Sequence, residues 1–347
     1  MRTTNPAIRV LLLFCALGWL VHSTTGVLRA AESPVTVADP RSASTQTVVL
    51  VAGAPAEPEY ATNFTQQAVA WRTACAKAGA RLFEIGTTIT ATNSAGEGDR
   101  EALKKCLSTV EPSGPEPLWL VLIGHGTFDG KSAKFNLRGA DLTPADLSEW
   151  LKPIQRPLVL IDTSSSSGPF LPLLSATNRV VITATRSGSE INFARFGGYL
   201  AGALGSAEAD LDQDGQVSAL EVFLSAAHRV DEFYRMEGRL VTEHALIDDN
   251  GDKLGTPATW FRGVRAIKKA KDGASIDGVR AHQLHLIRGA EELAMSVEAR
   301  ARRDSVETAI ARLRDQKATL SEDEYYARLE RLLLDLAGVG RAPKPQQ

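Results

Sequence analysis

The chain has few cysteines, few aromatic residues and no excess of charge of either sign. Three cysteines in 347 residues are too few for a disulfide-built scaffold or for a zinc site with four thiolate ligands. With 39 Lys and Arg against 41 Asp and Glu, no basic field covers the whole chain, so we expect no nucleic-acid partner. The hydrophobic fraction of 44% is that of a globular protein stabilised by a buried apolar core.

Long hydrophobic runs are also scarce, and the one that could be a targeting or membrane segment lies near the N-terminus. Val10–Val21 follows Arg2 and Arg9 and precedes a stretch of small and polar residues. This layout predicts a signal peptide over residues 1–31, and therefore a secreted or periplasmic protein with no membrane span after cleavage. A retained single-pass anchor is the alternative, although the run is short for a span. Residues 32–46 are expected to form a flexible leader.

The middle of the chain alternates apolar runs with amphipathic stretches. Strands are expected at Thr47–Ala52, Arg81–Ile85, Leu118–Ile123, Leu158–Asp162 and Arg179–Thr185. Helices are expected near Phe64–Ala78, Asp99–Leu107 and Pro144–Leu151. Continuous apolar strands that alternate with helices predict an α/β domain over residues 47–260, with a mostly parallel sheet covered on both faces.

Cys75 and Cys106 form an even pair in a compartment that would be oxidising. With strand order 2-1-3-4, right-handed crossovers place the helices that carry them on opposite faces of the sheet. We therefore predict two separate, mostly buried thiols.

Polar residues gather where two of the expected strands end. The third strand is followed by Gly124, His125 and Gly126, and the fourth by a run of serines. Because function collects at the carboxyl ends of parallel strands, an imidazole and a serine cluster would face each other across one crevice. A structural histidine beside an ordinary turn is the alternative.

Several short motifs occur in the order found in one peptidase group. They are Val51-Ala52-Gly53, Tyr60, Gln67-Ala68, Gly124-His125-Gly126 and Ser167-Gly168. In this respect the chain resembles the caspase clan, and within it the legumain-like branch (peptidase C13) that includes the glycosylphosphatidylinositol transamidase subunit. The resemblance covers about residues 47–250. It implies a caspase-like α/β/α sandwich in which His125 is the base of a catalytic dyad.

The nucleophilic cysteine of that family is replaced here. The alignment puts Ser165 in its place, or Ser164 after a shift of one residue. A thiol is partly ionised at neutral pH, whereas a serine hydroxyl needs a well-oriented base. The resemblance therefore implies a pseudopeptidase or an active hydrolase with a Ser165–His125 dyad and the Gly126 and Ser165 amides as oxyanion donors. A third alternative is a structural protein in which the cleft is inert and the acidic loop at residues 210–221 binds calcium.

The loop after the fifth strand lies where the family builds its specificity wall. Arg186, Ser187 and Glu190 are its candidate substrate-binding residues. A salt bridge between Arg186 and Glu190 that only holds the loop in place is the alternative.

The most specific local motif is an acidic loop of EF-hand type at residues 210–221. Its oxygen-bearing residues occupy the ligand positions of a calcium loop, with Gly215 at the sixth place: Asp210, Asp212, Asp214, Gln216 through its carbonyl, Ser218 and Glu221. Helices at Phe196–Ala207 and Glu221–Met236 are expected to flank it. Calcium is the predicted cofactor, and an acidic surface turn is the alternative. A second acidic stretch, 248–252, lacks the final glutamate and is expected to be a turn.

The last third of the chain predicts a helical hairpin over residues 277–337, followed by a disordered tail at 338–347. Val306, Ile310 and Leu313 mark its first helix, and Ser321 with Glu324 begins its second. Tyr325, Leu329, Leu332, Leu333 and Leu336 are expected on one side of the second helix. This hairpin would pack within the chain or on a protein partner. The function expected overall is a secreted, calcium-binding pseudopeptidase that binds a peptide or protein ligand or acts as a scaffold.

Overall fold

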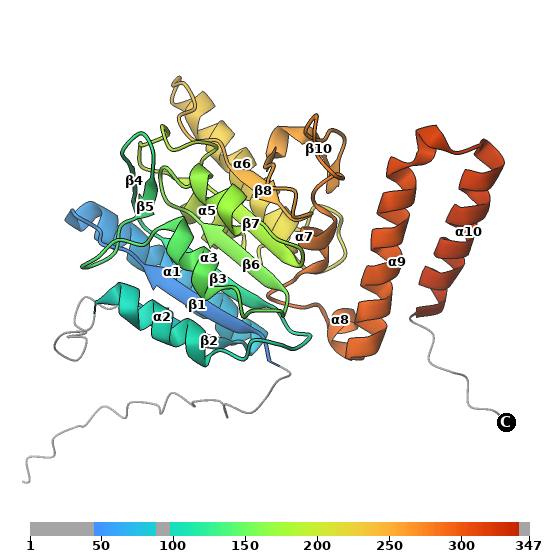
Figure 1. Ribbon diagram of the computed structural model, residues 1–347, viewed down its shortest axis with the longest axis horizontal. Coiled ribbons are helices and arrows are strands. Elements are labelled where there is room, and N and C mark those ends of the chain that lie inside the picture. Colours follow the sequence, from blue (N-terminus) through green and yellow to red (C-terminus); the bar gives the residue numbers. More distant parts are fainter. Residues whose placement is uncertain (1–44, 88–97, 340–347) are drawn as a thin grey trace, which may run out of the picture. The chain divides into compact units, whose positions relative to one another are not determined.

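The chain forms a mixed α/β structure around a seven-stranded, mostly parallel sheet (Figure 1). This computed structural model describes residues 45–87 and 98–339, so the expected signal peptide, most of the leader and most of the tail lie outside the described residues. The sheet order is β2-β1-β3-β6-β7-β8-β9. Its parallel strands are β1 (Thr47–Ala52), β2 (Arg81–Ile85), β3 (Leu118–Ile123), β6 (Leu158–Asp162) and β7 (Arg179–Thr183).

Every expected strand and the expected order of the first four are confirmed. All residues of β1, β3 and β6 are buried, as the continuous apolar runs predicted. The fifth strand ends at Thr183, because the next residues turn into the loop that contacts the serine run. Two short strands, β8 (Leu246–Asp248) and β9 (Thr256–Pro257), extend the sheet beyond β7.

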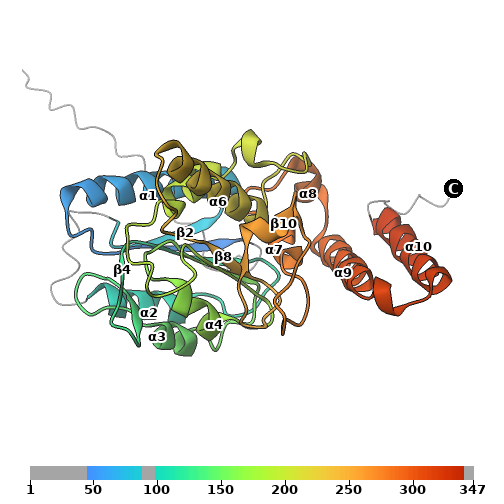
Figure 2. The same ribbon diagram turned by 90° about the horizontal axis from the view of Figure 1, so that it is seen from above.

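Helices cover both faces of the sheet (Figure 2). One layer contains α1 (Pro58–Ala78), α5 (Phe196–Ala203) and α6 (Ala219–Met236); the other contains α2 (Asp99–Thr109), α3 (Pro144–Trp150) and α4 (Leu171–Leu174). Side chains of β1 divide between the two layers in the alternating pattern of a strand, Val48 and Leu50 toward the first and Val49 and Val51 toward the second. The core is therefore two apolar clusters separated by the sheet.

Two hairpins and several short helices complete this part of the chain. They are β4 (Gly126–Phe128) with β5 (Ala133–Phe135), β10 (Phe261–Arg262) with β11 (Arg265–Ala266), α7 (Val279–Gln283), α8 (Ala290–Ala294) and four 3₁₀ turns, η1 (Gly168–Phe170), η2 (Ala207–Ala209), η3 (Ala258–Trp260) and η4 (Lys317–Thr319).

The C-terminal hairpin is shorter than its expected range. It consists of α9 (Val297–Asp315) and α10 (Glu322–Val339), which lie side by side in both views (Figures 1 and 2). Residues before it belong to the main core instead, since Ala281 and Leu286 pack in the first apolar cluster. Leu333 is 47% exposed, so the expected apolar side of α10 does not include it.

The end of the expected leader is fixed rather than loose. Gln46 is buried, accepts a hydrogen bond from the Trp119 indole (2.9 Å) and donates to the carbonyls of His285 and Leu286. This side chain ties the start of β1 to the segment before the C-terminal hairpin.

Within residues 45–87 and 98–339, no helix combines the length and the apolar character that crossing a bilayer requires.

Cys75 and Cys106 are both free, as predicted from the strand order. Cys75 lies in the cluster under α1, whereas Cys106 on α2 packs against the cluster on the opposite face. Burial raises the pKa of the Cys75 thiol to about 12 and that of Cys106 to about 11. Both thiols are therefore protonated at neutral pH.

We expect iodoacetamide to label Cys75 and Cys106 slowly in the folded protein and completely in urea, because the thiolate is the reactive form and burial limits access to it. Mass spectrometry of the two tryptic peptides measures this. A Cys75–Cys106 disulfide in oxidised material would contradict the observed strand order.

Candidate functional site

The residues expected to form a cleft do follow neighbouring strands. β3 and β6 pair in parallel, with Leu122 opposite Asp162 at their carboxyl ends. His125 follows the first of these strands and Ser165 the second, so the structure brings the two segments together. Their side chains, however, have different partners.

The Ser165 hydroxyl is bound to the backbone of Gly126. It donates to the Gly126 carbonyl (3.1 Å) and accepts from the Gly126 amide (3.2 Å), and Ser165 is only 3% exposed. A Cβ on Gly126 would lie 2.0 Å from the Ser165 carbonyl oxygen, so only glycine permits this approach. The Gly126 amide expected to stabilise an oxyanion is thereby occupied by the serine itself.

His125 is surrounded by aromatic rings. The centroids of Tyr60, Phe64 and Phe193 lie 4.5, 5.2 and 5.9 Å from that of the imidazole. Its Nε2 atom is buried and has no hydrogen-bond partner among the described residues. Burial lowers the pKa of His125, and a hydrogen bond to the Pro55 backbone only partly offsets this. The imidazole is therefore neutral and is not hydrogen-bonded to Ser165 through Nε2.

Ser164, the other candidate nucleophile, is bound to a buried carboxylate. Its hydroxyl (2.6 Å) and amide (3.0 Å) both donate to Oδ1 of Asp162. Asp162 is completely buried, and its Oδ2 has no partner among the described residues. Burial raises the pKa of Asp162 to about 7, against the opposing effect of the Ser164 hydrogen bonds.

The rest of the serine run is a turn that contacts the loop after β7. The Ser167 hydroxyl accepts from the Thr185 amide (3.1 Å), and the Thr185 hydroxyl accepts from the Gly168 amide (3.0 Å). Ser166 has a left-handed backbone (φ 57°), and its amide donates to the Glu190 carbonyl. The serine run therefore forms a turn, which was the alternative interpretation of this part of the sequence.

The loop that carries the expected substrate-binding residues is held by internal pairs. Arg186 contacts Glu190 at 3.1 Å, and Nδ1 of His244 lies 2.6 Å from the same carboxylate. The Ser187 hydroxyl lies 2.9 Å from that of Ser189. Glu190 is therefore engaged on two sides, as in the salt-bridge alternative, while the Arg186 side chain stays 61% exposed.

A pocket of about 210 Å³ lies beside this loop. Arg186 and His244 line one side of it, and Asp231 on α6 lines another; Phe196, Val230 and Pro257 supply apolar surface. It is a recess large enough for one ligand side chain, with charge of both signs at its wall.

The first acidic loop gathers its carboxylates as expected. One oxygen each from Asp210, Asp212 and Asp214 lie within 4.8 Å of one another. Asp210 accepts the amides of Asp214 (3.1 Å) and Gly215 (3.0 Å), and Gly215 has a positive φ of 86°. Three converging carboxylates form the hard oxygen donor set that calcium prefers.

Glu221 and Ser218 close this loop onto α6. Ser218 is the N-cap of the helix, and the two residues form a capping box in which the Ser218 hydroxyl donates to Glu221 (2.8 Å). The other Glu221 oxygen accepts the amides of Leu211 (2.8 Å) and Asp212 (3.3 Å). Gln216 bonds through its side chain to Asp214 and to the amide of Gly289.

One neighbour of this loop could not be recognised from the sequence. Nε2 of His282, from α7, lies 2.9 Å from Oδ2 of Asp212, and His282, Asp212 and Glu221 form a second group of possible metal ligands. Because His282 is 70 residues away along the chain, spacing within the loop motif could not reveal it.

The second acidic stretch forms a turn, as expected. Asp248 accepts the amides of Gly251 and Lys253 (both 2.9 Å), and Asp252 accepts those of Leu254 and Ala274 (both 2.9 Å). These carboxylates are used by the backbone of the turn and its neighbour.

No protein-family model matches this sequence, and no curated protein matches it. Among solved structures, the initiator caspase Dronc of Drosophila is similar at 13% identity, over 59% of this chain and 80% of Dronc, with a TM-score of 0.39. Caspase-1 of Spodoptera frugiperda is similar at 9% identity, over 59% of this chain and 86% of the caspase (TM-score 0.37). A protein of Geobacter sulfurreducens is similar at 13% identity, over 53% of this chain and 89% of that protein, with a TM-score of 0.35.

Proposed function

We propose that this chain is a secreted, calcium-binding protein of the legumain-like branch of the caspase clan that has lost peptidase activity and works as a peptide-binding or scaffold module. The observation that carries this proposal is the state of Ser165. Its hydroxyl is bound to the Gly126 backbone as both donor and acceptor, and it is almost fully buried. The motif order and the strand order β2-β1-β3-β6 support the family assignment.

The arrangement around Ser165 opposes catalysis for a chemical reason. A serine nucleophile needs a base that accepts its proton and a third group that orients the base. Here a hydrogen bond to the Pro55 backbone and the surrounding aromatic rings hold the imidazole of His125, but its Nε2 atom has no partner among the described residues and does not accept the Ser165 proton. Nucleophile, base and oxyanion donor are near one another without forming a catalytic unit.

Binding is supported by the recess beside the loop after β7. It presents Arg186, His244 and Asp231 around a partly apolar space of about 210 Å³. A peptide side chain placed there meets groups of both charges and an apolar wall, without contact to the Ser165 hydroxyl.

Calcium binding is supported by the carboxylates of Asp210, Asp212 and Asp214. The resident ion would supply structural stabilisation, by neutralising carboxylates that otherwise repel one another. Extracellular or periplasmic calcium would fill even a weak site of this kind.

We expect the native protein to leave a peptide library uncleaved in the presence of calcium, and Ser165→Ala to behave identically. Mass spectrometry of the library measures cleavage. Ser164→Ala is the matched control, because it removes the other candidate hydroxyl. Turnover by the native protein that is lost in Ser165→Ala would establish a serine hydrolase and contradict the proposal.

The variant Ser165→Cys distinguishes a cleft that lacks only its nucleophile from one that has also lost its catalytic geometry. Turnover by this variant, absent from the native protein, would show that the cleft keeps its geometry and now only binds. Binding itself is measured by retention of library peptides on the immobilised native protein. Failure to retain any peptide would contradict the peptide-binding part of the proposal.

A further inference from the structure

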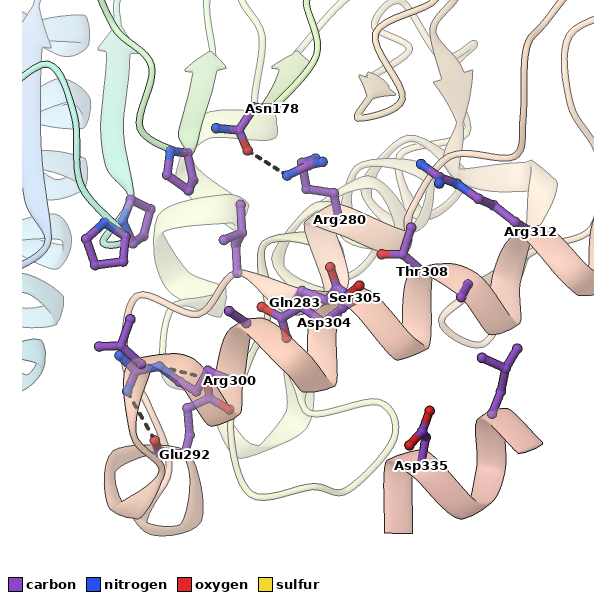
Figure 3. Close-up of a pocket in the computed structure, with 18 of the residues that line it drawn as sticks. Asn178, Arg280, Gln283, Glu292, Arg300, Asp304, Ser305, Thr308, Arg312 and Asp335 are labelled. Atoms are coloured by element: carbon purple, nitrogen blue, oxygen red, sulfur yellow. Dashed lines mark hydrogen bonds and ion pairs between the residues drawn. The ribbon is translucent and has the colours of Figure 1, made fainter. Parts of the chain in front are cut away.

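A second and larger groove lies at the amino-terminal ends of the parallel strands, opposite the candidate cleft (Figure 3). Its volume is about 1010 Å³, and one wall is formed by Pro117, Pro157 and Asn178, which precede β3, β6 and β7. The other wall comes from α7, α9 and α10. Because His125 and Ser165 follow the carboxyl ends of these strands, this groove is separate from the candidate cleft. We call it the arginine groove.

The arginine groove has an unusual set of charged side chains. Six arginines line it, against three carboxylates: Arg280, Arg288, Arg300, Arg312, Arg328 and Arg331 against Glu292, Asp304 and Asp335. No lysine and no aromatic residue lines it. Arginine is the side chain whose planar guanidinium pairs with a carboxylate through two parallel hydrogen bonds.

The three lining carboxylates already have partners. Glu292 and Asp304 both pair with Arg303, the latter at 2.8 Å, and Asp335 pairs with Arg302 at 3.0 Å. Neither Arg302 nor Arg303 is among the lining residues. Asp304 and Asp335 are therefore compensated from outside the groove, whereas Glu292 also lies 4.0 Å from Nε of the lining Arg300 (Figure 3).

Half of the lining arginines are paired as well. Arg288 and Arg300 share the buried carboxylate of Glu116, at 2.5 and 2.8 Å, and Arg328 pairs with Glu324. The two pairs with Glu116 fasten the segment before α9, and α9 itself, to the end of the sheet, whereas the Arg328–Glu324 pair lies within α10. They give the groove a fixed wall.

Three guanidinium groups remain without a carboxylate at ion-pair distance in the described part of the chain. Arg280 donates to the amide oxygen of Asn178 (2.7 Å), and its Nε is buried without a hydrogen-bond partner (Figure 3). The exposed side chains of Arg312 and Arg331 form no hydrogen bond or ion pair with any described residue. The buried carboxylate of Asp249 acts electrostatically on Arg280, so the uncompensated positive charge of the groove comes from Arg312 on α9 and Arg331 on α10.

We propose that the arginine groove binds an extended acidic peptide segment of a partner protein. Carboxylates of the segment pair with Arg280, Arg312 and Arg331, and its apolar side chains lie on Pro115, Leu284 and Leu332 of the lining. The volume is at the upper limit of small-molecule pockets, about 300–1,000 Å³. The free arginines favour a partner with carboxylates, and the apolar lining favours one that also carries apolar side chains, as a peptide does.

A nucleic acid fits this groove less well. Single strands are held by stacking bases on aromatic side chains, and the groove has none. The carboxylates of Glu292, Asp304 and Asp335 would also lie against a continuous phosphate backbone. A peptide can place its acidic and apolar residues to avoid them.

The test is fluorescence anisotropy with the full chain and a labelled peptide of alternating glutamate and leucine. The comparison probes are the same peptide with glutamine for glutamate and a labelled thymidine oligonucleotide. We expect the acidic peptide to bind best and the double variant Arg312→Gln/Arg331→Gln to weaken its binding by about tenfold, because losing two exposed ion pairs together removes a free energy of the order of the 1.4 kcal/mol that equals a factor of ten.

The matched control is Arg239→Gln/Arg262→Gln, which removes the same charge from exposed arginines outside the groove. It should leave binding of the acidic peptide within about twofold of the native protein, because screened long-range charges contribute little. Absence of binding, equal losses in the two double variants, or tighter binding of the oligonucleotide would each overturn the proposal. Because His125 and Ser165 take no part, these outcomes are independent of the proposed pseudopeptidase function.

Discussion

Replacing Glu221 with alanine is expected to lower the free energy of unfolding by about 3 kcal/mol or more and to abolish stabilisation by calcium. The Glu221 carboxylate is 1% exposed and accepts hydrogen bonds from Leu211, from Asp212 and twice from Ser218. Its removal leaves these donors without a partner and breaks the capping box of α6. Urea denaturation with and without a chelator measures both effects.

The matched control for this variant is Glu208→Ala. Glu208 lies just before the loop and carries the same charge, but its side chain is 79% exposed and, within residues 45–87 and 98–339, forms an ion pair only with Arg229. An exposed pair contributes about 0–1 kcal/mol, so this variant should remain close to the native protein. An equal loss of stability in the two variants would show that Glu221 has no special structural role.

Asp214→Asn separates calcium binding from folding. Among the described residues, the Asp214 carboxylate is hydrogen-bonded only by Gln216, and it is exposed, so the variant should fold with nearly native stability in the chelator. In the native protein, calcium at about a hundred times its dissociation constant should add about 2.7 kcal/mol and raise Tm. A native Tm that ignores calcium, or a full calcium shift in Asp214→Asn, would contradict a metal site at this loop.

Asp162→Asn is expected to remove a pH-dependent destabilisation of about 4 kcal/mol. Complete burial raises the pKa of Asp162 to about 7 in the folded protein, against about 3.9 in an unfolded chain. Between these values the folded state holds a proton that the unfolded state releases. Stability is therefore fully present below about pH 4 and falls as pH rises toward about 7.

The measurement is the free energy of unfolding by urea from about pH 4 to about pH 8. Asparagine resembles the protonated carboxyl and keeps an oxygen for Ser164. The free energy of unfolding of Asp162→Asn, relative to that of the native protein, should therefore increase as pH rises. Burial raises the pKa of Asp277 to about 8 with the same sign, but Asp277 is present in both proteins and cancels in the difference. Asp272→Asn, at an exposed position, is the control. A difference curve that is flat for Asp162→Asn would contradict this effect of burial.

Local pattern was sufficient for the framework of the fold. The apolar runs at β1, β3 and β6 could be recognised because a strand covered on both faces needs no polar residue. The prediction that Cys75 and Cys106 lie on opposite faces followed from strand order and crossover handedness alone. The spacing of Asp210, Asp212 and Asp214 likewise indicated which carboxylates converge, because they lie within one loop.

Side-chain partners in the cleft could not be predicted in this way. The sequence placed His125 and Ser165 at neighbouring strand ends, but the hydroxyl is bound to Gly126 and the imidazole packs among Tyr60 and Phe193. These contacts depend on side-chain orientation and on how closely two loops approach. Neither is encoded in the spacing of residues along one strand.

The strands and the carboxylates of the acidic loop could thus be recognised from the sequence alone, because each depends on residues close together in the chain. The separation of the two thiols followed from the expected strand order, which the pairing of β1 with β3 and of β3 with β6 confirms. Only the tertiary structure decided that Glu190 pairs with His244, that His282 reaches Asp212, and that the arginine groove exists. Those features join segments from tens to nearly two hundred residues apart. Their physical origin is the packing of whole elements against one another, which no local pattern records.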